Sequence, residues 1–268
     1  MISRIKNLFF KNQIEEALNC TAIRLLEQGY PATDEQKRWL AFGAVLFTQN
    51  LESCKTFKVL SDAECIKEML LTMWGIDSRE EALLIAEGLS MAKQHTPFGN
   101  FVFKSLPENG QMGPITRKDL ELTEEDLRAP DDPPLTSAEF EGTINSLIER
   151  INTGLISFTA ASSLLVELGF WEDELFDIDS IAAWDYGRTS MIARFSAKAG
   201  YLEEHETWSF MKTAADNAVN DYYNWRQYII GYILGRAIAY GNDSQDIKST
   251  LYYLLTNPNS PFENVSFK

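Results

Sequence analysis

An aspartate and an arginine stand one helical turn apart, beside a tryptophan, in the second half of the sequence. These residues are Trp184, Asp185 and Arg188. Side chains three residues apart share one side of a helix, so the aspartate and the arginine can form an ion pair. Arg236 lies in a largely apolar stretch, where an unpaired buried charge is strongly destabilising. We therefore expect Arg236 to need an acid, and Asp185 is the obvious candidate across a helix interface.

Two interpretations of this charged and aromatic group remain open. The group consists of Trp184, Asp185, Arg188, Trp225 and Arg236. It is either an arginine–aspartate pocket that holds an anionic ligand or a structural ion pair that fixes the helix register beside the two tryptophans. The structural interpretation predicts that the loss of Arg236 lowers the thermal stability of the protein.

A run of carboxylates after two aromatic residues forms the second candidate site. Oxygen ligands suit calcium or magnesium, but the spacing does not match an EF-hand loop and no glycine supplies its turn. Acids also stabilise the N-terminus of a helix, here one expected to begin at Ser180. A third interpretation is a protein-binding surface with an aromatic anchor inside an acidic ring. The candidate partner-binding residues are Phe170, Trp171, Glu172, Asp173, Glu174 and Asp177.

The common catalytic and metal-binding patterns are missing from the sequence. His95 and His205 have no cysteine or second histidine at ligand spacing. There is no glycine-rich phosphate loop, dinucleotide fingerprint or nucleophile elbow. The three cysteines are odd in number and form no CxxC pair. We therefore expect no cofactor, no metal and no disulfide framework, and we do not expect an enzyme.

The composition is strongly acidic. Thirty-nine acids against 24 bases give a formal charge of −15. Such a surface repels nucleic acid and anionic membranes and speeds encounter with basic partners, although solubility by itself also explains it. The apolar run over residues 228–240 is interrupted by Arg236 and is too short to span a membrane. The N-terminal apolar run is too short for a signal peptide. We expect a cytoplasmic protein without nucleic-acid or membrane partners.

Apolar residues three and four apart, together with capping signals, predict an all-α globular fold of many helices. Capping-box spacing at Thr33, Ser61 and Ser78 predicts three helix starts. Gly231 and Gly235, four apart, predict close packing of one helix against another. Further helices are expected over residues 14–28, 137–151, 159–168, 180–199, 203–223, 224–240 and 244–255.

A proline-rich, acidic stretch interrupts this helical pattern. Six of the nine prolines fall between residues 97 and 134, which predicts a long irregular connector, with a short extended piece over residues 101–103. The expected organisation is therefore an N-terminal helical region (1–95), the connector (96–135) and a C-terminal helical region (136–268). One compact domain throughout is the alternative.

The block from Trp184 to Arg236 resembles a bacterial family known only as a domain of unknown function. Its motifs are a Trp-Asp-x-x-Arg helix, an Ala-Gly-Tyr-Leu turn over 199–202, a helix that starts near a tryptophan, and a Tyr-x-Leu-Gly-Arg helix over 232–236. The resemblance extends from about Trp74 to the C-terminus. It implies a helical fold and brings no established catalytic residues. Some family members resemble immunity proteins in toxin loci.

The leading hypothesis is accordingly a cytoplasmic immunity protein that sterically covers an antibacterial toxin domain of nuclease or ADP-ribosyltransferase type. Its partner would be a basic toxin surface, captured quickly by electrostatic steering and held by an aromatic patch. Two alternatives are an enzyme of unrecognised class with the Asp/Arg anion pocket, and a regulatory scaffold protein.

Overall fold

The computed structural model describes residues 11–104, 114–119, 123, 134–241 and 244–268, and this part of the chain is all-α, as predicted. Its only extended pairing is an isolated bridge between Pro31 and Thr56. The α-helices are α2 (Thr21–Gly29), α3 (Asp34–Ala41), α4 (Ala44–Gln49), α5 (Ala63–Trp74), α6 (Arg79–Ser90), α7 (Thr96–Lys104), α8 (Ser137–Glu167), α9 (Ala183–Ala199), α10 (Glu204–Asp221), α11 (Trp225–Tyr240), α12 (Lys248–Thr256) and α13 (Pro261–Asn264). The 3₁₀ turns are η1 (Arg117–Asp119), η3 (Asp173–Phe176) and η4 (Gln245–Ile247).

Local capping chemistry sets most helix starts. Thr33 forms the predicted reciprocal capping box at the start of α3. The cap expected at Ser61 is wrong by one residue, because Asp62 accepts the hydrogen bond from the Glu64 backbone N–H at 2.9 Å. The Ser61 hydroxyl donates instead to the buried Glu52 carboxylate at 2.6 Å, so a tertiary contact takes the side chain that the local pattern assigned to the cap.

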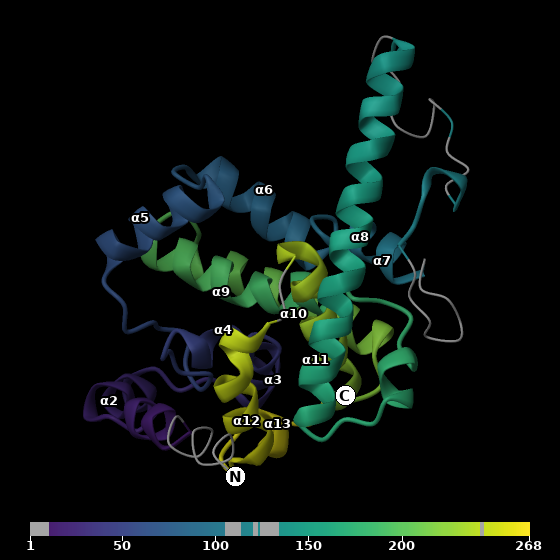
Figure 1. Cartoon of the computed structure of the whole chain (residues 1–268). Helices are drawn as coiled ribbons and strands as arrows, with labels where there is room; N and C mark the ends of the chain where they lie inside the picture. The colour runs from purple at the N-terminus through teal and green to yellow at the C-terminus, as the bar shows by residue number, and fades with distance from the viewer. Residues whose placement is uncertain (1–10, 105–113, 120–122, 124–133, 242–243) are drawn as a thin grey trace.

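The two helices expected over 137–151 and 159–168 are one continuous helix, α8, whose N-terminal part extends beyond the other helices (Figure 1). Gly154 lies in the stretch expected to separate them. A Cβ atom there would stand 3.1 Å from Val102 and 3.5 Å from Ile238. The glycine therefore sits where α8 meets α7 and α11, and this packing outweighs its weak helix propensity.

The beginning of the predicted irregular connector is helical. The extended piece expected over residues 101–103 is wrong, because these residues belong to α7. Pro97 occupies the first turn of that helix, where its missing N–H costs no helical hydrogen bond. Further along, the Asn152 side chain exchanges hydrogen bonds of 2.7 and 3.0 Å with the backbone of Ile115, which ties this segment to α8. Residues 105–113, 120–122 and 124–133 of the connector lie outside the described part.

The core is organised around α9, which packs against α4, α5, α6, α10 and α11 (Figure 1). Every residue of α9 except Ala197 and Lys198 is buried. One cluster of buried apolar side chains extends from Ala32 to Phe267 and includes both predicted helical regions. The boundaries at residues 95 and 135 stay a prediction. Within the described residues, no helix combines the length and apolar character needed to cross a membrane.

Glycines allow α9 and α11 to approach closely, as the spacing of Gly231 and Gly235 predicts. A Cβ on Gly235 would lie 2.7 Å from the Ile181 carbonyl oxygen and 2.8 Å from the Trp184 Cβ. On the facing helix, a Cβ on Gly187 would lie 2.7 Å from the Tyr232 ring. Backbone atoms cannot move aside as a flexible side chain can, so the site of Gly235 has no room for a methyl group.

We predict that Gly235→Ala lowers the free energy of unfolding by about 1–3 kcal/mol, because the added methyl overpacks the contact between α9 and α11. Gly142→Ala is the matched control, since a Cβ there meets no atom within 4 Å. Gly142→Ala should raise the free energy of unfolding by roughly 0.5–1 kcal/mol, because the residue lies in an exposed part of α8. Urea unfolding measures both changes, and equal stability of Gly235→Ala and the wild type would contradict the close-packing argument.

Candidate functional site

Asp185 and Arg188 form the ion pair that their spacing predicts, between Oδ1 and Nη2. The other carboxylate oxygen, Oδ2, accepts hydrogen bonds from the backbone N–H groups of His95 and Thr96, at 3.0 and 3.1 Å, and from the Thr96 hydroxyl at 2.8 Å. These N–H groups stand at the start of α7, where a negative charge is favourable. One carboxylate therefore neutralises a buried arginine on its own helix and caps a second helix.

This arrangement keeps the Asp185 carboxyl ionised although it has no exposed surface. Burial by itself raises the pKa of this carboxyl, whereas hydrogen bonds from His95 and Thr96 and the charge of Arg188 lower it. The lowering effects win, and the pKa lies below the ordinary aspartate value. Because Asp185 and Arg188 are both closed off from solvent, the geometry supports a structural ion pair rather than a ligand pocket.

The expected pairing of Arg236 with Asp185 is wrong. Arg236 Nη2 lies 2.7 Å from the Asp246 carboxylate, and its Nη1 donates to the Ser244 hydroxyl at 3.1 Å. The two arginines nevertheless flank one ring: the Arg188 and Arg236 guanidinium carbons lie 4.6 and 5.9 Å from the centre of the Trp184 ring. Asp185 already accepts hydrogen bonds from other donors. The turn η4 therefore supplies the acid that Arg236 needs, Asp246.

Trp225 does not join this group. Its ring lies 4.8 Å from that of Phe42, 5.0 Å from Phe262 and 4.9 Å from Phe267. Its indole N–H donates to the Val265 carbonyl at 2.8 Å. The five residues predicted to form one site are therefore not one group. Trp225 lies apart from the other four and holds the C-terminal segment against α3 and α11.

His95 connects the ion pair to a cavity of about 520 Å³ between α7, α8 and α11. Its Nδ1 lies 2.7 Å from Arg188 Nη2, an arginine nitrogen that can only donate. Nδ1 is therefore the acceptor, and a neutral His95 carries its proton on Nε2. Glu149, Arg150 and Tyr240 line the same cavity. No local pattern in the sequence indicates this contact, because 93 residues separate the histidine and the arginine.

The second predicted site is divided between the core and the surface. Trp171 is 73% exposed, as an anchor must be, but Phe170 is only 3% exposed. The Arg226 guanidinium lies 4.3 Å from the centre of the Phe170 ring and forms an ion pair with Glu174 at 2.7 Å. Phe170 as an exposed anchor is therefore wrong, and Glu174 serves to hold this turn against α11.

Two exposed aromatic residues that the sequence did not single out complete this surface. Phe176 is 49% exposed and Tyr223 is 76% exposed. Phe176 ends the turn η3. The Gln227 side chain joins Tyr223 to Asp177 after this turn, since it donates to Asp177 at 2.8 and 3.1 Å and accepts from the Tyr223 N–H at 2.9 Å. We name this surface the acidic–aromatic edge, and it comprises Trp171, Glu172, Asp173, Phe176, Asp177 and Tyr223.

The carboxylates of this edge do not form a metal site: among the described residues, no three histidine, cysteine or carboxylate side chains are placed to hold a metal ion. Nor do they precede a helix beginning at Ser180, because α9 begins at Ala183 and Asp173 and Glu174 belong to the separate turn η3. Glu174 accepts the Trp171 N–H at 2.7 Å at the start of that turn. The interpretation as a protein-binding surface stays a prediction.

Comparison with known proteins identifies the family that the motifs suggested. A family model described as "Protein of unknown function (DUF1266)" matches residues 69–267. A segment of 56 residues is 38% identical to the uncharacterized protein YbeR of Escherichia coli (strain K12). That match covers 21% of this chain and 24% of YbeR. No solved structure matches the chain.

We predict that Asp185→Asn lowers the free energy of unfolding at neutral pH by about 3–5 kcal/mol, because Arg188 is left buried without its counter-charge. A carboxyl whose pKa is lowered by folding contributes stability above its unfolded pKa of about 3.9 and loses it as the pH falls through the folded pKa. The wild type should therefore lose stability below about pH 4 more steeply than Asp185→Asn.

Asp173→Asn is the control for this comparison, since it removes an exposed carboxylate without a basic partner among the described residues. Its stability should stay within about 0.5 kcal/mol of the wild type. Chemical unfolding at a series of pH values measures all three proteins. Parallel pH profiles of the wild type and Asp185→Asn would show that this carboxyl does not stabilise the fold through its charge.

Proposed function

We propose that this chain, which belongs to the DUF1266 family of proteins of unknown function, is a cytoplasmic binding protein of the immunity type. In this proposal the acidic–aromatic edge covers a basic surface of an antibacterial toxin domain and blocks access to the active site of the toxin. The inhibition is steric, and the chain itself makes and breaks no covalent bond. The observation that carries the proposal is the exposure of three aromatic side chains on one acidic edge.

The shape of the edge suits a binding surface. Trp171 and Tyr223 expose most of their side chains, and tryptophan and tyrosine are enriched among the residues that dominate interface affinity. The turn η3 after Trp171 is held in place by the Arg226–Glu174 ion pair and by buried Leu175. A surface that is rigid before binding loses little conformational entropy when a partner is bound.

The charge of the edge favours a basic partner. Three carboxylates of the edge, those of Glu172, Asp173 and Asp177, make no ion pair with any residue that the structure describes. Together with the formal charge of −15, they attract a positively charged protein and raise the rate of association. The same field repels nucleic acid, which supports a protein rather than a polynucleotide as the partner.

The enzyme alternative receives less support. Asp185 and Arg188 are buried and engaged with each other, so they are not free to contact an anionic substrate. A scaffold protein would use the same edge with a different partner. If residues of the cavity beside His95 catalysed a reaction, His95→Gln would abolish protection of the cell from the toxin. The complex with the toxin domain would stay intact.

We predict that Trp171→Ala combined with Tyr223→Ala weakens binding of the toxin domain encoded beside this gene by at least about thirtyfold, because two exposed anchors are lost. The folded structure should be unaffected, since both side chains extend into solvent. Calorimetric titration measures the affinity, and co-expression with the toxin domain measures protection of the cell.

The matched control is Met73→Ala with Leu84→Ala, which removes two equally exposed apolar side chains from α5 and α6. It should bind as the wild type does. The association rate of the wild type should fall as salt is raised from about 50 to about 500 mM, because screening weakens the steering. Cell death on co-expression, with no complex in gel filtration, would rule out immunity; unchanged affinity of the double variant would rule out this edge.

A further inference from the structure

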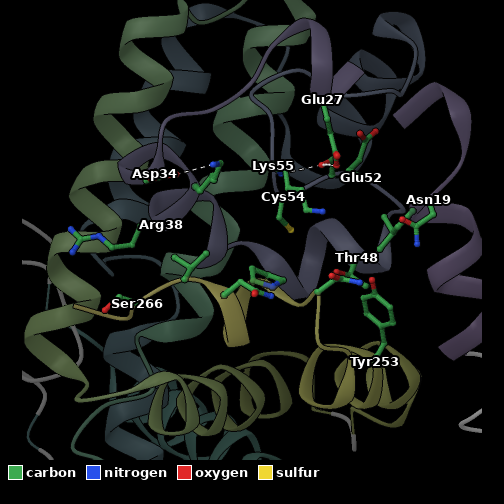
Figure 2. A pocket seen from close by; sticks show the side chains of 17 residues that line it. Asn19, Glu27, Asp34, Arg38, Thr48, Glu52, Cys54, Lys55, Tyr253 and Ser266 are labelled. Carbon is green, nitrogen blue, oxygen red and sulfur yellow. Dashed lines mark hydrogen bonds and ion pairs between the residues drawn. The ribbon is translucent and has the colours of Figure 1, made fainter. Parts of the chain in front are cut away.

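A cavity lies away from both of these regions, between the N-terminal helices and the C-terminal segment. Its volume is about 700 Å³. One wall comes from α3, α4 and residues 52–55, and the opposite wall from α12 and residues 259–266 (Figure 2). The first wall lies outside residues 69–267, the part matched by the family model. The cavity thus lies between a segment outside the family match and a segment within it.

The acidic side chains that line this cavity are already engaged. Asp34 forms an ion pair with Lys37 at 2.8 Å. Glu52 accepts hydrogen bonds from the backbone N–H groups of residues 60 and 61 at 2.7 and 2.9 Å. Glu27 accepts a hydrogen bond from the Ser53 hydroxyl. Each carboxylate therefore has a partner within the protein, and none needs a ligand.

Two cationic side chains in the same lining are not engaged. Arg38 and Lys55 form no ion pair with any described residue. The Nε of Arg38 is buried and has no hydrogen-bond acceptor among the described residues. A buried donor without an acceptor is costly, so it calls for an acceptor from an ordered water or a bound group. In Figure 2, Arg38 lies at one end with Ser266, and Lys55 lies beside Cys54 in the middle.

A further positive charge lies behind the wall. Arg194 is buried and donates to the carbonyl oxygens of Ser53, Phe57 and Lys58, at 3.1, 2.9 and 2.9 Å. Carbonyl dipoles offset its charge only partly. Burial raises the pKa of the neighbouring Cys54 thiol to about 12, so this side chain stays neutral at physiological pH. Three carboxylates and three cationic side chains line the cavity, so their formal charges cancel. Arg194 behind the wall therefore leaves a local surplus of one positive charge, within a protein whose net charge is strongly negative.

We propose that this cavity binds a small amphipathic organic anion. Lys55 would hold the anionic group in the middle of the cavity, Arg38 would add a positive charge at its end, and neutral donors and acceptors on Thr48 and Asn259 would orient the polar part of the ligand. The apolar body would rest on Leu18, Tyr253 and Val265, which also line the cavity. A cavity of this volume is within the range that encloses a metabolite-sized molecule. This binding site is independent of the acidic–aromatic edge.

The test uses two probes of similar shape on the full chain. Anilinonaphthalene sulfonate carries an anionic group on an aromatic body, whereas N-phenylnaphthylamine has the aromatic body without the charge. The wild type should bind the sulfonate at one site, with enhanced fluorescence. Arg38→Met combined with Lys55→Met should weaken this binding roughly tenfold or more, because the charged hydrogen bonds are lost. Binding of the neutral probe should change less than twofold.

The matched control is Lys198→Met combined with Lys212→Met, which changes the net charge equally at exposed positions that do not line the cavity. This variant should bind the sulfonate as the wild type does. Circular dichroism melting shows that each variant folds. The proposal is overturned if the wild type does not bind the sulfonate, if the Arg38/Lys55 variant keeps full affinity, or if the control variant loses affinity equally.

Discussion

The burial of charged side chains along α9 is the constraint on which the rest of the structure depends. This helix is enclosed on nearly all sides, yet it carries Asp185, Arg188 and Arg194. A buried charge without a partner costs several kcal/mol. Asp185 and Arg188 neutralise each other within α9, but Asp185 and Arg194 also need hydrogen-bond partners from other segments. The fold satisfies them through segments that are remote in the sequence, and these contacts fix where those segments lie against α9.

Each compensated charge positions a different part of the chain. Asp185 caps the start of α7 and so places His95 beside the cavity between α7, α8 and α11. Arg194 binds the carbonyl oxygens of Ser53, Phe57 and Lys58 and thereby shapes a wall of the cavity between the N-terminal helices and the C-terminal segment. Arg236 repeats the pattern on α11, where it binds Asp246 in η4. The interior charges therefore stabilise the fold. Binding of ligands and partners is left to groups at the surface and in the cavities.

The periphery contains two regions of opposite character. The acidic–aromatic edge exposes carboxylates without basic partners beside Trp171 and Tyr223, which suits a basic protein surface. The cavity between the N-terminal helices and the C-terminal segment contains Arg38 and Lys55 without acidic partners among the described residues, which suits a small anion. The acidic overall composition indicates the first kind of partner and gives no sign of the second.

The sequence by itself determined whatever depends on contacts within one or two helical turns. The all-α class, the cap at Thr33, the Asp185–Arg188 pair and the close packing at Gly235 follow from helix geometry and side-chain size. Only the tertiary structure decided which acid neutralises Arg236, which helix Asp185 caps, and which aromatic residues stay exposed. The physical reason is that many donors and acceptors can satisfy a buried charge equally well. Packing of segments far apart in the chain selects among them.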